Sequence, residues 1–513
     1  MPIRTGRPDK PIWTGRLSPR YNRRVNKDWC SMGRICAWLF SALLAAGCAP
    51  TARLKVALNL RPDQESWYRA RILRPFEKKH HCVVELKSYQ DPALLPDLLA
   101  SGDSIDLADP PLAMTRGLVA RNLIAPLDEF VPAKDLADLR KEYFLMDLGA
   151  VRGQTFFLPR YLETPVLLYL KSQVAEAVQY WELRKDEIDR ALAKYNGKGL
   201  PRNYVLEKDP SQWDYFDLFV AGYFWSNKEV QGQRRGRIAL GPTGSPALPQ
   251  ILADKCFQAG AGQDALLRMG DDAVVDMFQW QAVLVREGIL NPGLIKSSWS
   301  DTQIREGFRS GELFLSEATQ MEAFLIHGNG TPEMPGFLSN PGDMGVALMP
   351  KGISMLLDQR GAPLREGRHS VGTRGQWLGV TRKSRNRELS WQLAHYLSGT
   401  QNQILESSAY GSIPVRQDLL GELGLMFGGG WTSDLFQTAS QQLVENRFTL
   451  APMVEEFSEI GGNYADAYRE ICLPGDGQKT RFEDIQKTLE DRFIPRQRQI
   501  LGAKYPERAV SKR

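Results

Sequence analysis

The sequence predicts an α/β protein with two lobes. Strand-like and helix-like segments alternate along the first part of the chain in the order β-α-β-α-β, which favours a parallel or mixed sheet flanked by helices. Of the 513 residues, about 466 follow a predicted leader, more than a single hydrophobic core normally serves. Composition is ordinary for a globular protein and no internal repeat is visible, which excludes a solenoid.

These alternating segments follow one another without long gaps. Arg53 to Leu60 alternates apolar and polar residues as a half-buried strand does, and Glu65 to His80 carries apolar residues at partial helical spacing. The remaining segments are a strand at 82–89, a helix at 92–102, an apolar step at 104–111 and a helical stretch that ends with residues 117–131. In sheets of this kind, ligands bind beyond the carboxyl ends of the strands.

The N-terminal 47 residues have the pattern of a signal peptide. An apolar run from Ile35 to Ala46 follows several basic residues, and it is too short to cross a bilayer as a helix. The run ends in the sequence LAAGC, which resembles the lipobox of bacterial lipoproteins, so Cys48 is the expected lipidation site and 48–53 the tether. Ordinary cleavage beside an incidental cysteine is the alternative. Since 32–48 already forms a compact signal, Met32 is a candidate for the true start.

Charge and cysteine content exclude several classes of function. The whole chain has a formal charge of +5 at pH 7, but nine basic and two acidic residues lie in 1–47, which leaves 56 basic against 58 acidic residues. The mature chain therefore gives no sign of nucleic-acid binding. Cys82, Cys256 and Cys472 remain after the leader and Cys48, so we expect at most one disulfide and no cysteine metal site.

The sequence lacks the common catalytic and cofactor motifs. There is no G-x-S-x-G elbow, H-E-x-x-H motif, phosphate-binding loop or dinucleotide fingerprint. The five histidines are scattered, and His80 and His81 stand among lysines, as at a solvated helix end. A glycosidase pair stays open, since it is defined by the separation of two carboxylates in space. We expect no enzyme activity, no cofactor and no metal.

Five segments together resemble extracellular solute-binding proteins of ABC importers, especially the sugar-binding group. Each resemblance is weak alone, but the segments occur in the family's order over nearly the whole mature chain. They are ASGDSIDLADPPLAMTRGLVARNLIAPLDEF (100–130), RGQTFFLPRYLETPVLLYLKSQV (152–174), SQWDYFDLF (211–219), FRSGELFLSEATQMEAF (308–324) and, from 377 to 419, WLGVTRKSRNRELSWQLAHYLSGTQNQ followed by YGSIPVRQDL.

This resemblance implies a periplasmic-binding-protein-like fold of type II, with a hinge and an interlobe cleft. It places 54–158 and 346–412 in the first lobe and 159–345 and 413–513 in the second. The implied protein is an exported monomer, lipid-anchored in the periplasm or at the cell surface, which captures a carbohydrate and delivers it to the permease of an ABC transporter. A surface lipoprotein that reports to a sensor kinase would have the same sequence features, and a peptide or polyamine stays open as ligand.

By position against the family pattern, eight residues are candidate ligand contacts. Sugar sites combine aromatic platforms with side chains that hydrogen-bond hydroxyl groups. The candidates are Asp63 and Gln64 after the first strand, Asp109 in the next ligand loop, Tyr161 and Glu163 after the first crossing, Gln320 at the family's frequent tryptophan position, and Trp67 and Trp377 as platforms.

Each of these candidates has a structural alternative. Trp67 on a helix is more often part of a core than a ligand contact, and the carboxylates of Asp109 and Glu163 are equally suited to capping backbone groups. Arg160 would suit an acidic sugar, but a lone arginine is usually solvated or paired.

Overall fold

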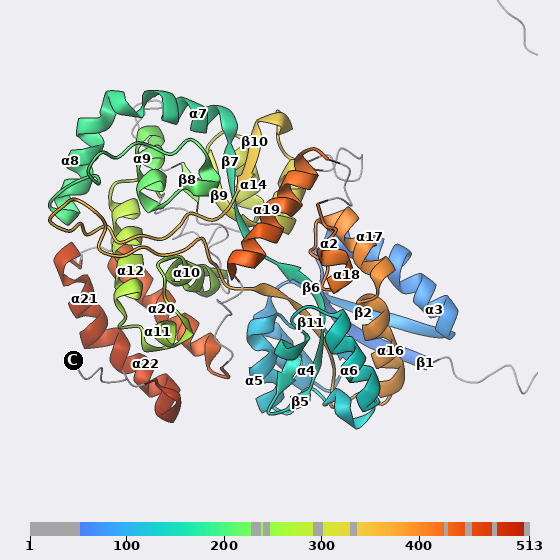
Figure 1. Ribbon diagram of the computed structural model, residues 1–513. Helices are drawn as coiled ribbons and strands as arrows, with labels where there is room; N and C mark the ends of the chain where they lie inside the picture. The colour runs from blue at the N-terminus through green and yellow to red at the C-terminus, as the bar shows by residue number, and fades with distance from the viewer. Residues whose placement is uncertain are drawn as a thin grey trace, which may run out of the picture. The chain divides into compact units, whose positions relative to one another are not determined.

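The computed structural model describes residues 52–226, 237–239, 247–290, 301–328, 336–424, 429–446, 454–473 and 480–506, drawn as a ribbon in Figure 1. Residues 53–513 group into one unit. The expected signal peptide (1–47) and Cys48 lie outside the described residues. Within the described ranges, no helix has both the length and the apolar character needed to span a membrane.

The first lobe is built on a five-stranded mixed sheet with the strand order β2-β1-β3-β11-β6. β1 and β3 are parallel, whereas β11 runs antiparallel to both β3 and β6. The strands are β1 (Ala52–Asn59), β2 (Cys82–Tyr89), β3 (Leu107–Ala108), β6 (Phe157–Glu163) and β11 (Arg374–Val380). A separate small hairpin joins β4 (Ala150–Val151) to β5 (Gln154–Thr155).

The second lobe is built on a four-stranded sheet with the order β10-β7-β9-β8. β7 is antiparallel to β10 and β9, and β8 is parallel to β9. The strands are β7 (Pro165–Leu170), β8 (Ile238–Ala239), β9 (Leu315–Thr319) and β10 (Met344–Ala347).

Helices accompany both sheets (Figure 1). Those of the first lobe are α2 (Pro62–Tyr68), α3 (Arg74–His80), α4 (Leu95–Ala100), α5 (Thr115–Ala120), α6 (Ala133–Glu142), α16 (Arg387–Leu397), α17 (Thr400–Tyr410) and α18 (Gln417–Leu420). Those of the second are α7 (Lys171–Tyr180), α8 (Lys185–Asn196), α9 (Tyr215–Ser226), α10 (Ala247–Gln258), α11 (Gln263–Arg268), α12 (Asp272–Arg286), α14 (Asp301–Arg309), α15 (Gln320–His327), α19 (Trp431–Glu445), α20 (Phe457–Cys472), α21 (Ile485–Thr488) and α22 (Ile494–Leu501).

The elements expected from the start of the chain are confirmed except the helical stretch through 117–131, where α5 ends at Ala120 and one 3₁₀ turn follows at Leu127–Glu129. The strands at 53–60 and 82–89 are β1 and β2, and the apolar step at 104–111 contains β3. The helix expected at 65–80 is α2 and α3 joined by a π-helical turn, Arg69–Leu73. A π turn inserts one residue per turn, which explains why the apolar spacing there is only partly helical.

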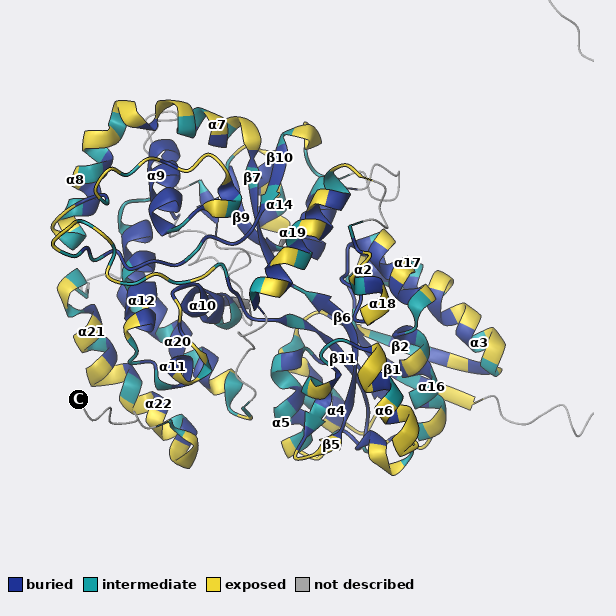
Figure 2. Cartoon of the chain, viewed as in Figure 1, coloured by how far each residue is buried: buried dark blue, intermediate teal, exposed yellow. Residues whose placement is uncertain are grey.

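Hydrophobic patterning accounts for where the helices lie. In α8, Ile188, Ala191 and Leu192 are buried on one face, and the helix ends where Gly197 adopts a φ of +74°, a conformation that favours glycine. α9 is apolar apart from Asp217 and Ser226, and every one of its residues is buried, as its uniform colour in Figure 2 shows. Cys82, Cys256 and Cys472 are all buried and unpaired.

The chain passes between the two sheets three times. The first passage is at Thr164, between β6 and β7, and the second leads from β10 into β11. The third lies between α18, which contacts α6 of the first lobe, and α19, which contacts β7 and β10 of the second.

Sheet membership therefore moves the expected lobe boundaries at 159, 346 and 413. β6 belongs to the first sheet, and β10 pairs with β7 in the second. The irregular segment 348–373 also packs with the second lobe, where the Trp280 Nε1–H donates to the carbonyl of Ile353 (2.6 Å). Ile413 stays with the first lobe, since its N–H donates to the carbonyl of Leu162. Such long-range pairings leave no periodic signal in the sequence.

Candidate functional site

Two predicted ligand loops meet at one edge of the first sheet. β1 and β3 are parallel, so their carboxyl ends lie side by side and the loops after Asn59 and Ala108 are neighbours. The backbone N–H of Asn59 donates to Oδ1 of Asp109 (2.7 Å), which ties the two loops together. This edge, with the adjoining passage at Thr164, is the candidate site.

Four side chains on α2, its preceding residue and α17 form an aromatic and charged group, here called the Trp67 group: Arg61, Asp63, Trp67 and the buried Tyr410. The Trp67 ring meets the Tyr410 ring edge-on with centroids 5.0 Å apart. The Arg61 guanidinium lies 5.9 Å from the centre of the Tyr410 ring and pairs with the Asp63 carboxylate (3.1 Å). Asp63 is exposed and Trp67 partly buried, so both are accessible to a ligand.

Gln64, also predicted as a ligand contact, is buried and serves the backbone. Its Oε1 accepts from the N–H of Arg61 (2.9 Å) at the first turn of α2. This bond satisfies a backbone donor at the start of the helix. The side chain therefore fixes the turn that carries Asp63 and does not face solvent.

Asp109 lies in a buried set of ionisable groups, here called the Arg160 cluster: Tyr68, Tyr89, Asp109, Arg160 and Glu406. Arg160 pairs with the carboxylate of Asp109 through Nη1 and with that of Glu406 through Nη2 (2.6 Å). The Tyr89 hydroxyl donates to the carbonyl of Asp109 (2.8 Å), and the guanidinium lies 5.0 Å from the centre of the Tyr68 ring. All five residues are buried.

Burial decides the ionisation of this cluster. It raises the pKa of Asp109 to about 6, even though the Arg160 guanidinium beside it acts in the opposite direction. Burial also raises the pKa of Glu406, again against the effect of Arg160. Two carboxylates that share one guanidinium cannot both be fully compensated, so the cluster takes up a proton more readily than exposed carboxylates do.

Tyr161 and Glu163 continue along β6 beyond Arg160. Tyr161 is buried and its ring centre lies 5.0 Å from the Arg160 guanidinium. Glu163 is half-buried and stands opposite Arg374 of β11 in the antiparallel register. Of the two predicted residues, Glu163 is therefore the one that a ligand could reach.

Gln320 is fully buried and joins the lobes at the first passage. Its Oε1 accepts from the N–H of Thr164 (2.8 Å), and its Nε2 donates to the carbonyls of Leu162 and Gly411 (both 3.3 Å). Because these backbone groups use both ends of the amide, Gln320 is engaged as a hinge cross-link and is not open to a ligand. Asn446 adds a second tie through Nδ2, which donates to Oγ1 of Thr164 (3.1 Å).

Trp377 is 0% exposed, which corrects the expectation of a sugar platform at this position. β11 is an inner strand between β3 and β6, and all of its residues after Arg374 are buried. Because successive side chains point to opposite faces of the sheet, both faces of the strand are covered. With both ring faces packed in the core, Trp377 offers no stacking surface in this structure. Of the two predicted platforms, only Trp67 is accessible.

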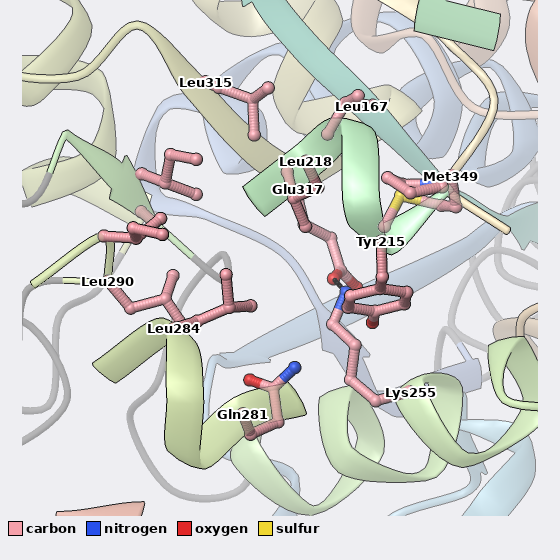
Figure 3. A pocket seen from close by; sticks show the side chains of 14 residues that line it. Leu167, Tyr215, Leu218, Lys255, Gln281, Leu284, Leu290, Leu315, Glu317 and Met349 are labelled. Carbon is pink, nitrogen blue, oxygen red and sulfur yellow. Dashed lines mark hydrogen bonds and ion pairs between the residues drawn. The ribbon is translucent and has the colours of Figure 1, made fainter. Parts of the chain in front are cut away.

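A second buried ionic group lies under the start of β11, in the other lobe. Arg374 pairs with Asp254 of α10, and Lys255 of the same helix pairs with Glu317 of β9 (2.6 Å). Figure 3 shows Lys255, Glu317 and the Gln281 amide at a small cavity lined otherwise by apolar side chains. Its volume is about 20 Å³, room for one water molecule and far too little for a sugar ring.

Metal binding finds no support at these groups. Within the parts of the chain that the structure describes, no three His, Cys, Asp or Glu side chains gather in a way that could hold a metal ion. Asp63, Asp109, Asp254, Glu317 and Glu406 each pair with an arginine or a lysine.

Comparison with known proteins decides the family. The family of bacterial extracellular solute-binding proteins matches residues 71–422, well over half of the chain. The chain belongs to this family. No curated protein matches the solute-binding protein at a significant level.

Solved structures share its two-lobed fold. The GacH receptor of Streptomyces glaucescens, crystallised unliganded and with acarbose, has a TM-score of 0.61 at 14% identity and covers 88% of this chain and 98% of its own. A solute-binding protein from Thermotoga lettingae bound with α-D-tagatose has a TM-score of 0.62 at 15% identity, covering 88% and 100%. The Listeria monocytogenes protein Lmo0181, in complex with cycloalternan, gives 0.62 at 12%, covering 88% and 99%.

Sequence reasoning missed three residues of the candidate site of this solute-binding protein. Glu406 and Tyr410 come from α17 and contact residues more than 200 positions earlier in the chain. Tyr410 stands at the start of the segment YGSIPVRQDL that carries the family resemblance, so its position was a usable signal. Arg374 is the first residue of β11 and pairs with Asp254, 120 residues earlier in the chain. A pairing over this distance leaves no local pattern in the sequence.

Proposed function

We propose that this solute-binding protein captures a carbohydrate, specifically an oligosaccharide, between its lobes and delivers it to the permease of an ABC importer. The observation that carries the proposal is the family match over 71–422, combined with a fold shared with proteins crystallised with acarbose, tagatose and cycloalternan. A binding role, not catalysis, is what the family's description names.

The accessible residues of the candidate site suit a sugar. Trp67 supplies a partly buried aromatic face for the apolar side of a sugar ring. Asp63 and Glu163 supply carboxylates that accept hydrogen bonds from hydroxyl groups. Gln64, Asp109, Tyr161, Gln320 and Trp377 are all buried, so we assign them no direct contact with the sugar.

Export and anchoring complete the proposal. The family is extracellular, and the leader 1–47 with Cys48 gives a route to the membrane surface by acylation. A single acyl chain binds a bilayer only marginally, so stable attachment needs the several chains of a lipoprotein anchor. We propose a monomer that meets its permease at that surface.

A ligand screen tests the proposal. Protein lacking residues 1–48 is heated with maltotriose, cycloalternan, tagatose, amino acids, short peptides, polyamines or metal ions. A ligand that binds only the folded chain stabilises it by mass action, by about 2.7 kcal/mol at a ligand concentration a hundredfold above Kd. This stabilisation raises the midpoint of thermal unfolding. Stabilisation by sugars alone is expected, whereas stabilisation by a peptide or polyamine and no sugar would refute the carbohydrate assignment.

A further inference from the structure

Arg160 lies at the meeting point of the elements that form the candidate site. Its side chain is 1% exposed and extends from the hinge strand β6. One side of the guanidinium pairs with Asp109, in the loop after β3, and the other with Glu406 on α17. These partners lie 51 residues before it and 246 residues after it in the chain. One side chain thus connects three separate stretches of the first lobe.

Arg160 is unsuited to binding a ligand directly. It is buried, and two carboxylates already compensate its charge, so an acidic sugar would find no available cation here. Buried arginine forks of this kind fix geometry, since the planar guanidinium holds two carboxylates in set directions.

The Asp109 loop has further ties to β1, β2 and, through the N–H of Trp377 that donates to the carbonyl of Pro110, to β11. None of these three ties involves α17. The N–H of Asn59 and the Tyr89 hydroxyl both donate to Asp109, and they come from β1 and β2 on one side. Among the described residues, Arg160 is the side chain that forms ion pairs with both Asp109 and Glu406. Glu406 lies four residues before Tyr410 on α17.

Resting on the proposed function, we propose that Arg160 is a positioning residue for the sugar site. It sets the spacing between the Asp109 loop and α17, and so between Asp63 and Trp67 on one side and Tyr410 on the other, without touching the sugar. Because it stands on β6 four residues before Thr164, it also links this spacing to the hinge.

Protonation of Asp109 tests whether its ion pair with Arg160 sets the geometry of the sugar site. The charged or titratable groups that face it are Arg160 and Tyr161 from β6, Tyr89 from β2, Tyr68 from α2 and Glu406 from α17. Since burial raises the pKa of Asp109 to about 6, about ten of every eleven Asp109 side chains are neutral at pH 5, and the ion pair with Arg160 is lost in those molecules.

Ligand affinity and stability then change in opposite directions. If only the ion-paired form is competent, the apparent Kd rises by the inverse of its population, about tenfold between pH 7.5 and pH 5. Folding stability moves the other way: a carboxyl whose pKa is raised in the folded state binds its proton earlier than in the unfolded chain, so its contribution to stability increases as pH falls from about 6 to 4. If Arg160 only stabilised the fold, sugar affinity would not fall while folding stability rises.

Hydrogen exchange measured by mass spectrometry tests the positioning without any sugar. The variants are Arg160→Lys, Asp109→Asn and, as a matched control, Arg365→Lys, which also removes a guanidinium paired with two carboxylates, those of Asp272 and Asp276. Arg160→Lys should accelerate exchange at least tenfold in 107–117 and 400–411 and leave α12 unchanged. Arg365→Lys should not affect those two segments. Unchanged exchange at 107–117 and 400–411, or equal acceleration throughout the chain, would overturn the proposal.

A second arm measures sugar affinity against pH, with whichever of maltotriose, cycloalternan and tagatose stabilises the wild-type chain. The wild-type Kd should rise about tenfold between pH 7.5 and pH 5, and the Kd of Asp109→Asn, which has no proton to gain, should stay level. A level wild-type profile overturns the proposal. If none of the three sugars binds, the carbohydrate assignment fails, and the exchange experiment still decides the role of Arg160.

Discussion

Replacement of Trp377 by alanine separates a core residue from a sugar platform. The side chain is 0% exposed, and a buried tryptophan removes about 150–250 Å² from water. At about 25 cal/mol per Å² this contributes about 4–6 kcal/mol, in line with the ~3–5 kcal/mol that truncation of buried aromatic residues costs. The indole N–H has no hydrogen-bond partner among the described residues, and its removal returns about 1–3 kcal/mol. The net expected loss is therefore about 3 kcal/mol.

Calorimetric melting of protein without ligand measures this loss. The unfolding entropy near 60 °C is about 2.1 cal/mol/K per residue, so for a chain of this size a loss of about 3 kcal/mol lowers the midpoint by about 3 °C if both lobes unfold together. The midpoint falls further if the first lobe unfolds alone. The additional stabilisation by sugar should be the same as in the wild type, because Trp377 does not reach the ligand.

Trp67→Ala is the matched control. Trp67 is partly buried and meets Tyr410 edge-on, a pairing that contributes about 0.5–1.5 kcal/mol. We expect a small loss of stability and at least a tenfold weaker sugar affinity, equivalent to about 1.4 kcal/mol. A nearly unchanged midpoint for Trp377→Ala together with lost sugar stabilisation would refute the core assignment and restore Trp377 as the platform.

Three further predictions concern a buried ion pair, a helix end and the anchor. Lys255→Met leaves Glu317 with a largely uncompensated buried charge, so urea denaturation should show that the free energy of unfolding falls by about 3–5 kcal/mol. The double variant with Glu317→Leu should recover most of this loss. Equal losses in the single and double variants would count against the pairing. Gly411→Ala should lower the melting midpoint, since φ is +73° and an added Cβ would lie 2.6 Å from that of Phe324 across the lobes; an unchanged midpoint contradicts this geometry. Cys48→Ala should release the protein from membrane fractions, and continued membrane retention argues against the lipid anchor.

The early strands and the family were predictable because their signals are local. β1 alternates apolar and polar residues, and the segments that resemble the family are contiguous in sequence. The orientation of side chains on the inner strands was harder to predict. β6 is buried at all positions but the last and β11 at all but the first, so no alternation shows which way Arg160 or Trp377 points.

Pairings across long stretches of chain account for the remaining differences. The segment 348–373 has no periodic pattern, and its contact with Trp280 cannot be inferred from spacing. Gln320 occupies the family's platform position but binds the backbone of Thr164 and Gly411. That role depends on the path of the first passage between the sheets, which becomes visible only when both lobes are in place.

The most direct test of carbohydrate capture is to identify what the protein carries. The chain is produced with its leader, purified without denaturation and released from its bound molecules by heating, and the released molecules are identified by mass spectrometry. We expect an oligosaccharide at up to one molecule per chain in the wild type and much less in Trp67→Ala. Recovery of a peptide, an amino acid or a polyamine at that ratio, with no sugar, would contradict the proposed function.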